Sequence, residues 1–311
     1  MSPHHAALAA VRVAAQAKIN LFLRILAREA SGYHQLETLF CRLELADSVV
    51  VRVTRTGGSI DCRGSDVGPA AHNLAYKATL AYAAVRHGWP PGFAIEIEKV
   101  IPVGAGLGGG SADAGAALRA LHALDPNPLP DAVVLDIARQ LGADVPFLSI
   151  DAPLALGWAR GDRLLPLAPL PLRQLLLYVP PVAVSTREAY EWLAAARGDT
   201  VAGAMVLPEA ALREWGALVP YMVNDFESVV AGRHPVVDGA LATLRAAPGV
   251  CAASLTGSGS AVYAVIEEPR RDAADAMRRE AASRLRAVGV AGARLFHTAT
   301  AENVVAVEPL E

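Results

Sequence analysis

The chain has 311 residues, of which 53% are hydrophobic and 19% are charged, and its formal net charge is -3. This length is typical of about two domains, and the composition is that of a globular protein with a sizeable core rather than a disordered chain. No block of like charge points to nucleic acid or to an anionic membrane as a partner. We therefore expect a small-molecule ligand.

The cysteines are odd in number and show no CxxC spacing: they are Cys41, Cys62 and Cys251. A disulfide framework or a zinc site is not expected, and thiols in a reducing cytosol are the simpler interpretation. The other histidines, away from the motifs below, also lack metal-ligand spacing, so no metal site made of side chains is predicted.

The N-terminus contains Ala15-Gln16-Ala17, which resembles a signal-peptidase site. However, no Lys or Arg precedes the apolar run, and Arg12 interrupts it. We interpret the first residues as a short loose leader before a first strand. A second apolar stretch, residues 165–184, is broken by prolines and by Arg173, so it is not expected to span a bilayer. The sequence predicts a soluble cytoplasmic protein.

The first half of the chain mixes strands and helices. Alternating and β-branched apolar residues predict strands over residues 11–26, 38–54 and 92–100. Helical periodicity predicts helices over residues 73–88, 111–124 and 131–142, the first of them ending at Gly88. Gly57-Gly58 is interpreted as a turn.

The second half begins in a proline-dense stretch around residues 165–182, where we place a domain boundary. Beyond it, the patterns predict strands over residues 175–180 and 303–308, two strands around a glycine turn within residues 253–267, and helices over residues 186–197, 237–247 and 272–289. The elements do not alternate strictly. This favours an α+β fold with helices on one face of mixed or antiparallel sheets.

The stretch PVGAGLGGGSADAG, residues 102–115, joins a predicted strand to a predicted helix. Gly104, Gly106 and Gly109 match the dinucleotide pattern GxGxxG, but a lone match is weak. A dinucleotide-binding fold would continue into a second parallel strand with an acidic residue, whereas HALDPNPLPDAV stands there. No lysine follows the glycines as a Walker A loop requires, and the protein-kinase glycine loop lies between two strands.

The physical chemistry of this stretch still indicates an anion site. Glycines adopt positive φ and let backbone N–H groups approach a ligand, and the helix that follows points its free N–H groups and positive end at the same place. Ser111 could cap the helix, contact a phosphate or reach a bound Mg²⁺. The alternative is close packing of the helix on the strand with no ligand, but packing rarely needs so many consecutive glycines.

Three stretches together resemble the GHMP kinases: AKINLFLRI near the N-terminus, the glycine loop, and SLTGSGSAVYAV near the C-terminus. Two more, GYHQLETLF and LGADVPF, make the chain similar over essentially its whole length to the 4-diphosphocytidyl-2-C-methyl-D-erythritol kinases of the non-mevalonate isoprenoid pathway. The resemblance implies a two-domain α+β GHMP kinase fold with the active site in the inter-domain cleft. Residues 1–170 would form the ATP-binding domain, and residues 171–311 a C-terminal domain that contributes to substrate binding.

The resemblance also implies the reaction and its participants. The γ-phosphate of ATP would pass, with Mg²⁺, to the 2-hydroxyl of 4-diphosphocytidyl-2-C-methyl-D-erythritol. The protein would be a monomer or a weak homodimer with no nucleic-acid or membrane partner. Asp144 matches the family's base on the acceptor hydroxyl, and Lys18 matches the lysine beside it. Without the motif, the favoured interpretations are a helix-ending cap after Gly142 for Asp144 and a solvated strand residue for Lys18.

The resemblance assigns further residues to the nucleotide. These are Asn73 and Lys99 at the adenine pocket, the latter mainly through its backbone, and Pro102, Gly104, Gly106, Leu107, Gly108, Gly109, Gly110 and Ser111 in the loop. Ala105 replaces a usual glycine, so ordinary φ is expected there. Asp113 stands where asparagine or aspartate occurs, and its role is open.

The substrate residues implied by the resemblance come from four places in the chain. They are Asn20 for the polyol, Tyr33 and His34 for the cytidine, Thr186 and Tyr190 for a second wall of that pocket, and Thr256, Gly257, Ser258 and Gly259 in a turn that closes the site. Arg187 and Tyr190 stand where the family often has proline and phenylalanine. Ordinary loop or turn roles are the alternatives for these stretches.

Three rival functions stay open. Another small-molecule GHMP kinase, such as a homoserine kinase, would prefer an amino acid as acceptor. A non-catalytic relative would bind ATP without turnover, although Lys18 and Asp144 are both present. A dehydrogenase would be protected from unfolding by NAD rather than by ATP.

Overall fold

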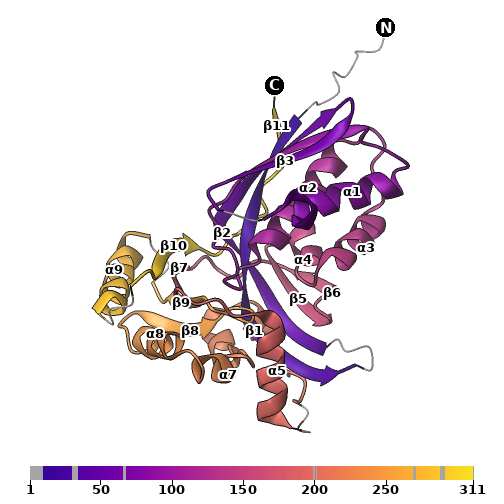
Figure 1. The fold of residues 1–311 in the computed structure, drawn as a ribbon. Coiled ribbons are helices and arrows are strands. Elements are labelled where there is room, and N and C mark those ends of the chain that lie inside the picture. Colours follow the sequence, from indigo (N-terminus) through magenta and orange to yellow (C-terminus); the bar gives the residue numbers. More distant parts are fainter. Residues whose placement is uncertain are drawn as a thin grey trace.

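The computed structural model describes residues 10–29, 34–65, 68–198, 200, 202–268, 271–287 and 291–310. The expected leader of residues 1–9 and the predicted cytidine contact Tyr33 lie outside these residues. Within them the chain folds into two sheets with helices packed on each, one sheet above the other in Figure 1.

The first sheet has the order β11-β1-β2-β4-β3, and β5 and β6 branch from β2. Its strands are antiparallel except for the parallel pair β3 and β4. The strands are β1 (Ala10–Arg28), β2 (His34–Thr54), β3 (Gly57–Arg63), β4 (Gly92–Glu98), β5 (Leu154–Ala159), β6 (Arg163–Leu167) and β11 (Glu308–Leu310).

Strands β1 and β2 are 19 and 21 residues long and run nearly the height of the molecule (Figure 1). Their pairing shifts register between Gln16 and Lys18 and again between Asn20 and Phe22. Such irregularities bend a strand and re-aim its side chains. Lys18 and Asn20 lie between the two shifts, both buried. The distortion of β1 therefore falls where two predicted site residues must turn toward the site.

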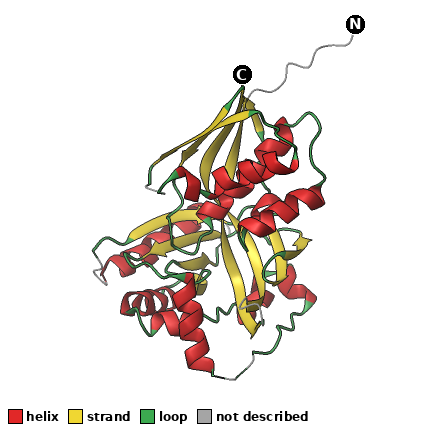
Figure 2. Cartoon of the chain, turned by 45° about the vertical axis from the view of Figure 1, so that its right-hand side comes forward, coloured by secondary structure: helices red, strands yellow, loops and turns green. Residues whose placement is uncertain are grey.

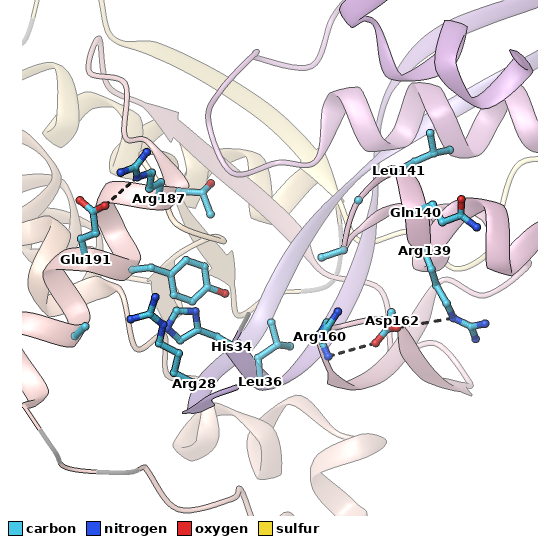
Figure 3. Close-up of a pocket in the computed structure, with 15 residues that line it drawn as sticks. Arg28, His34, Leu36, Arg139, Gln140, Leu141, Arg160, Asp162, Arg187 and Glu191 are labelled. Carbon is cyan, nitrogen blue, oxygen red and sulfur yellow. Dashed lines mark hydrogen bonds and ion pairs between the residues drawn. The ribbon is translucent and has the colours of Figure 1, made fainter. Parts of the chain in front are cut away.

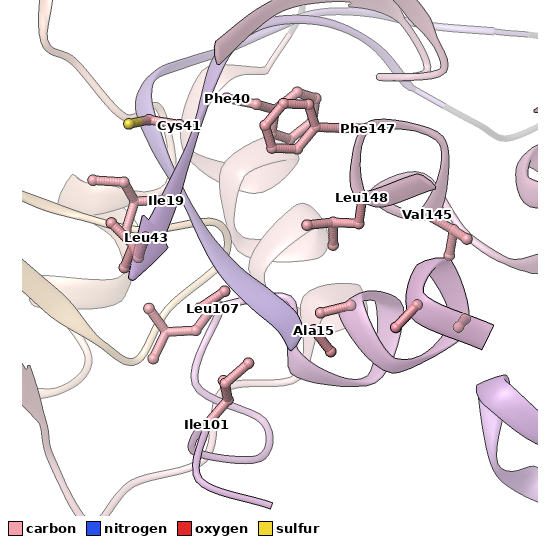
Figure 4. Packing of buried hydrophobic residues seen from close by; sticks show 14 of the residues in the cluster. Ala15, Ile19, Phe40, Cys41, Leu43, Ile101, Leu107, Val145, Phe147 and Leu148 are labelled. Atoms are coloured by element: carbon pink, nitrogen blue, oxygen red, sulfur yellow. The ribbon is translucent and has the colours of Figure 1, made fainter. Parts of the chain in front are cut away.

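Helices α1, α2 and α3 lie together on one face of the first sheet (Figure 2), with α4 beside them. They span α1 (Leu74–Val85), α2 (Gly109–Leu124), α3 (Asp131–Leu141) and α4 (Val145–Ser149). Helix α2 is buried and rich in alanine, so its backbone packs closely on β1, β2 and α4. Figure 4 shows the apolar packing around α4, where the rings of Phe40 and Phe147 stack with centroids 4.9 Å apart.

The second sheet is antiparallel, with the order β10-β7-β9-β8. Its strands are β7 (Gln174–Val179), β8 (Val250–Leu255), β9 (Val262–Ile266) and β10 (Arg294–Ala299). The helices of this half are α5 (Thr186–Arg197), α6 (Trp215–Leu218), α7 (Glu227–Ala231), α8 (Pro235–Arg245) and α9 (Arg271–Ala287). Short 3-10 helices are η1 (Ala70–His72), η2 (Glu209–Leu212) and η3 (Val219–Tyr221).

The C-terminal segment returns to the first sheet. The Gln16 side chain bonds the backbone of Asn303 and Val305, and the Arg119 guanidinium donates to the Val305 carbonyl. Strand β11 then pairs with the start of β1. Apart from this segment, strands up to Leu167 belong to the first sheet and strands from Gln174 to the second. The boundary after residue 170 stays a prediction.

Most predicted elements are present, and the α+β class is confirmed. Two predictions are wrong. Gly57-Gly58 opens β3, pairing in parallel with Gly92 and Phe93, instead of forming a turn. The last strand covers only residues 308–310. The backbone of Asn303 and Val305 forms hydrogen bonds with the Gln16 side chain instead of with a neighbouring strand. Strands β3, β5, β6 and β10 were not anticipated. No helix in the described part of the chain is long and apolar enough to cross a membrane.

The packing of α2 against α4 can be tested at Gly115. A Cβ there would lie 2.4 Å from the Leu148 carbonyl oxygen, so Gly115→Ala should lower the free energy of unfolding by about 1–3 kcal/mol. Gly110→Ala is the matched control, because its Cβ would meet only a Leu74 methyl at 3.8 Å. That change should leave stability unchanged or raise it by up to about 1 kcal/mol. Equal denaturation curves for the two variants would contradict this packing.

Candidate active site

The glycine loop, residues 102–110, lies between the two sheets. On one side the Leu107 carbonyl accepts a hydrogen bond from the Lys18 amide of β1 at 3.0 Å. On the other side the Ala105 carbonyl accepts one from the Ala261 amide, just before β9, at 3.1 Å. The Thr256 hydroxyl also donates to the Gly106 carbonyl at 3.3 Å. The loop is thus fixed from both halves of the molecule.

Two glycines of the loop are required by geometry. At Gly106 a Cβ would lie 2.2 Å from the Thr256 carbonyl oxygen. Gly108 is the N-cap of α2 with φ 73°, a left-handed conformation that other residues rarely adopt. Because Gly108 holds the cap position, Ser111 lies inside the first turn and does not cap the helix. Ala105 is buried with ordinary φ, as expected.

The start of α2 provides anion-binding groups. The amides of Gly109, Gly110 and Ser111 precede the first helical hydrogen bond, from Ala112 to Gly108, and so have no partner within the helix. Gly106, Gly108 and Ser111 line a cavity of about 210 Å³ that also contains Lys18 and Asp144. Helix N-termini favour phosphate and carboxylate ligands.

Lys18 and Asp144 form an ion pair in this cavity. The Lys18 ammonium lies 3.3 Å from a carboxylate oxygen of Asp144, and the side chains are 3% and 30% exposed. Asp144 sits at the N-cap position of α4 but makes no side-chain capping bond. Its carboxylate is therefore available to the cavity, and neither the cap interpretation of Asp144 nor the solvated-strand interpretation of Lys18 holds.

Asn20 joins this pair to both sheets. Its Oδ1 accepts hydrogen bonds from the Lys18 ammonium at 2.8 Å and from the Gly257 amide at 3.0 Å. Its Nδ2 donates to the Thr38 hydroxyl at 2.7 Å, and its carbonyl accepts from the Tyr263 hydroxyl at 3.0 Å. A buried amide with every group bonded is held rigidly. Lys18 is positioned by the same contacts.

A larger cavity of about 840 Å³ opens beside the first one (Figure 3). The rings of His34 and Tyr190 stack there with centroids 4.2 Å apart and an interplanar angle of 17°. Burial, and secondarily Arg28, lowers the pKa of His34, which favours the neutral imidazole. Burial and Asp144 raise the pKa of the Tyr190 phenol to about 12. Thr186, at the start of α5, meets Ser258 with hydroxyl oxygens 2.9 Å apart.

Four arginines line this larger cavity. Arg28 lies beside His34, with Arg187 on the same side of the cavity, and Arg139 and Arg160 lie on the opposite side (Figure 3). Arg160 pairs with Glu29 and Arg187 pairs with Glu191. Arg139 pairs with Asp136 and approaches Asp162 at 3.9 Å. The cavity combines stacked rings with four guanidinium groups, three of them paired with carboxylates, and guanidinium groups and aromatic rings suit a flat ligand that carries anionic groups.

Two residues assigned to the adenine pocket have structural partners. The side-chain oxygen of Asn73, Oδ1, caps α1 by accepting hydrogen bonds from the Ala75 and Tyr76 amides. The Lys99 ammonium is bound by Asp47 at 2.5 Å and by Asp113 at 2.6 Å, with all three side chains buried. The Lys99 ammonium is therefore not directed at a ligand, in line with a backbone role.

Asp113, whose role the sequence left open, belongs to this buried cluster. Burial raises the pKa of its carboxyl to about 7, since Lys99 offsets only part of the desolvation and Asp47 adds a second negative charge. Despite its own burial, the two carboxylates raise the pKa of Lys99. One oxygen of Asp113, Oδ1, is buried without a hydrogen-bond partner among the described residues.

Comparison with known proteins places this geometry in a family. The model of the GHMP kinase N-terminal domain matches residues 73–150, and that of the GHMP kinase C-terminal domain matches residues 206–287. The 4-diphosphocytidyl-2-C-methyl-D-erythritol kinase of Desulfotalea psychrophila is 37% identical, covering 81% of this chain and 84% of its own. The kinase of the same name from Salinibacter ruber is 38% identical, covering 82% and 89%.

The chain belongs to the 4-diphosphocytidyl-2-C-methyl-D-erythritol kinase family. A crystal structure of a kinase with that name superimposes with a TM-score of 0.74 at 34% identity, over 93% of this chain and 98% of the other. Homoserine kinase from Cytophaga hutchinsonii, at 19% identity and a TM-score of 0.61, shares the fold. The two-domain GHMP kinase fold expected from the motifs is confirmed, and the rival interpretations are not favoured.

Three residues that hold the candidate site's groups in place escaped the sequence analysis. Thr38 bonds Asn20, and strand alternation could have placed it on the face of His34. Asn224 donates to the carbonyls of Leu255 and Gly257 and so holds the turn after β8, but its own stretch carries no signal. Asp47 contacts Lys99 only through long-range packing, which local patterns do not reveal.

The buried carboxyl of Asp113 makes stability depend on pH. Its pKa is higher in the folded chain than in the unfolded one, so the folded state holds more protons between about pH 4 and pH 7, and the free energy of unfolding falls as pH rises through that range. Each unit of pKa difference is worth about 1.4 kcal/mol. Asp113→Asn should flatten this part of the profile, as measured by urea denaturation from pH 4 to 8. If the free energy of unfolding depends on pH equally in the variant and the wild type, Asp113 is not the source of this pH dependence.

Proposed function

We propose that the protein phosphorylates the 2-hydroxyl of 4-diphosphocytidyl-2-C-methyl-D-erythritol with ATP, in the non-mevalonate route to isoprenoid precursors. The observation that carries this proposal is the Lys18–Asp144 pair, because it lies in one cavity with the glycine loop and beside a larger cavity with stacked rings and arginines. Relatives whose alignments cover more than 80% of this chain bear the name of this kinase.

Asp144 would act on the acceptor. Its carboxylate, oriented by the Lys18 ammonium at 3.3 Å, accepts the proton of the hydroxyl as the hydroxyl oxygen bonds to the γ-phosphorus and the bond to the β-phosphate oxygen breaks. ADP and the phosphorylated alcohol are the products. Lys18 balances negative charge on the transferring phosphoryl, and Asn20 keeps its ammonium in place.

The glycine loop would hold the triphosphate. Gly108 and Ser111, at the start of α2, line the same cavity as Lys18, so the free amides there would be available to phosphate oxygens. The loop would be shaped by Pro102, Gly104, Gly106, Leu107, Gly108, Gly109, Gly110 and Ser111. Asn73, at the start of α1, and the backbone of Lys99 would line the adenine. The Asn73 side-chain oxygen caps α1 and its side-chain nitrogen donates to the Cys62 sulfur at 3.6 Å, so only the second hydrogen of that nitrogen would be left for a ligand.

Magnesium fits this site only as an ion carried largely by the triphosphate. In the described part of the chain no three His, Cys, Asp or Glu side chains come together as a metal site. The cavity offers the Ser111 hydroxyl and the Asp144 carboxylate, and Mg²⁺ is typically held by one or two protein groups together with phosphate oxygens and water. Bound there, it would neutralise triphosphate charge.

The larger cavity would take the cytidine diphosphate part of the substrate. His34 and Tyr190 stack on each other and offer flat faces to a pyrimidine, a role that Tyr33 would share. Thr186 and the turn of Thr256, Gly257, Ser258 and Gly259 close the passage to Asp144. The arginines around the cavity suit the diphosphate.

The deciding experiment measures ADP release from ATP and Mg²⁺ with the cytidine substrate. Wild type should turn over, and Asp144→Asn should lose about 10²–10⁴-fold in kcat while its affinity for ATP is kept. Asp151→Asn, an exposed acid after α4, is the matched control and should behave as wild type. If wild type binds ATP but ignores this substrate, the cytidine assignment fails and other hydroxylated acceptors must be screened.

The stacking role of Tyr190 gives a separate prediction. Tyr190→Ala should raise KM for the cytidine substrate about 5- to 150-fold, because base stacking on one ring is worth about 1–3 kcal/mol. Its KM for ATP should not change. Tyr190→Phe keeps the ring and should stay close to wild type. An increase in the KM for ATP instead would move Tyr190 out of the acceptor site.

A further inference from the structure

Asp225 has no role in the transfer described above, yet its carboxylate is bound from both halves of the molecule. Its Oδ2 accepts the Ile25 amide of β1 at 2.6 Å and lies 2.6 Å from the guanidinium of Arg197, the last residue of α5. The Arg24 guanidinium lies 3.2 Å from its other oxygen. Because the Asp225 side chain is only 12% exposed, these charged hydrogen bonds are stronger than those at the surface.

The backbone next to Asp225 is also held by β1. The Leu23 amide donates to the Val223 carbonyl at 2.8 Å, and the Asp225 amide donates to the Leu23 carbonyl at 2.9 Å. These bonds form an isolated parallel bridge between Leu23 and Asn224. Leu23 lines the smaller cavity. Asp225 is therefore fixed to β1 by its backbone and by its side chain, close to the candidate site.

Helix α5 offers only a narrow apolar stripe to the rest of the protein. Two of its twelve residues, Ala189 and Leu193, are buried. Its last residue, Arg197, pairs with Asp225 and donates to the Ile25 carbonyl, so this end of α5 lies beside β1 (Figure 1). The position of α5 on β1 therefore depends on the polar contacts at its end.

The aromatic wall of the larger cavity depends on the same elements. Tyr190, on the second turn of α5, stacks on His34 with ring centroids 4.2 Å apart. The Phe226 ring meets Tyr190 edge-on, with centroids 4.9 Å apart and an interplanar angle of 89°. Phe226 is 2% exposed and directly follows Asp225 in the chain. Asp225 thus holds the helix that carries Tyr190, through Arg197, and it precedes the ring against which Tyr190 rests.

We propose that Asp225 is a positioning residue for the acceptor: by holding the end of α5 against β1 through Arg197, it places the Tyr190 ring on which the base of the substrate stacks. This rests on the proposed function, in which the larger cavity takes the cytidine part. Loss of the Asp225 charge leaves two guanidinium groups close together without a counter-charge, which loosens α5 from β1.

The nucleotide side is fixed by other contacts. The glycine loop bonds to β1 at Lys18 and to the segment before β9 at Ala261. Asp225 contributes to neither bond. A change at Asp225 should therefore weaken binding of the acceptor and leave binding of ATP as it is.

The test compares Asp225→Asn with wild type in steady-state kinetics and in calorimetry of CDP and Mg-ADP binding. The variant keeps the size of the side chain and one oxygen for the Ile25 amide, but it loses the charge. Its KM for the cytidine substrate and its Kd for CDP should rise about 3- to 30-fold, because a misplaced ring loses part of its stacking. Its kcat, KM for ATP and Kd for Mg-ADP should not change.

Glu209→Ala is the matched control, because Glu209 also pairs with an arginine, Arg213, but these side chains are 77% and 73% exposed. This variant should behave as wild type. If Asp225→Asn is less stable but binds CDP and the cytidine substrate as wild type does, Asp225 has a merely structural role and the proposal is overturned. An equal rise of the KM values for ATP and for the acceptor would overturn it as well.

Arg197→Gln tests the route through α5, and it keeps the proposal testable if Asp225→Asn does not fold. It should raise the KM for the cytidine substrate without changing the KM for ATP, and Arg197→Lys, which keeps the charge, should recover part of the loss. In the double variant of Asp225→Asn and Arg197→Gln, the rise should be smaller than the product of the two single rises. An unchanged KM in Arg197→Gln, or a full product in the double variant, would overturn the proposal.

The result is separable from the proposed function. Absence of both turnover and CDP binding in wild type refutes the proposed function and the role of Asp225 together. Turnover by wild type, with an unchanged KM for the acceptor in Asp225→Asn and in Arg197→Gln, refutes only the role of Asp225.

Discussion

The site depends on one steric constraint, the passage of the glycine loop between two sheets. At Gly106 the loop runs so close to the Thr256 carbonyl that no side chain fits, and on either side Leu107 and Ala105 bond to β1 and to the segment before β9. This close approach of the loop to Thr256 requires glycine at position 106, and the hydrogen bonds of Leu107 and Ala105 stabilise it. Because the loop is fixed from both halves, the start of α2, Lys18 and the turn after β8 keep a constant relation to one another.

Asn20 links that constraint to the Lys18–Asp144 ion pair. A buried lysine is costly unless its charge is met, and here a carboxylate and an amide oxygen meet it at 3.3 Å and 2.8 Å. The same amide oxygen accepts the Gly257 amide from the second half of the chain. The Asn20 oxygen is therefore shared between the Lys18 ammonium and the contact with the second half of the chain.

The parts of this structure that local sequence could predict are those with local causes. Periodicity indicated α1, α2, α3 and α5 close to their observed bounds, and the motifs indicated Lys18, Asn20 and Asp144, which the structure brings together. What failed has long-range causes. Gly57 became a strand residue because β4 offered a parallel edge, and residues 303–307 lost their strand to contacts with Gln16 and Arg119. The pairing of Asp113 with Lys99 required the fold itself.

The segments beside Asp144 and the glycine loop are fixed by buried side chains, whereas the larger cavity is more exposed. Behind Asp144, the fully buried Arg42 donates to the carbonyls of Phe147, Ile150 and Ala152, and stacks on the Phe147 ring, so the segment that follows the carboxylate is fixed by charged hydrogen bonds. Behind the loop, Asp47 fixes the entry segment in the same way. The larger cavity is lined instead by arginines and by the stacked rings of His34 and Tyr190, and the Tyr190 ring also meets Phe226 edge-on and packs against the apolar cluster of the second half. A fold built like this fixes the glycine loop and the segment after Asp144 by buried hydrogen bonds, whereas most side chains that line the larger cavity are exposed or half-buried.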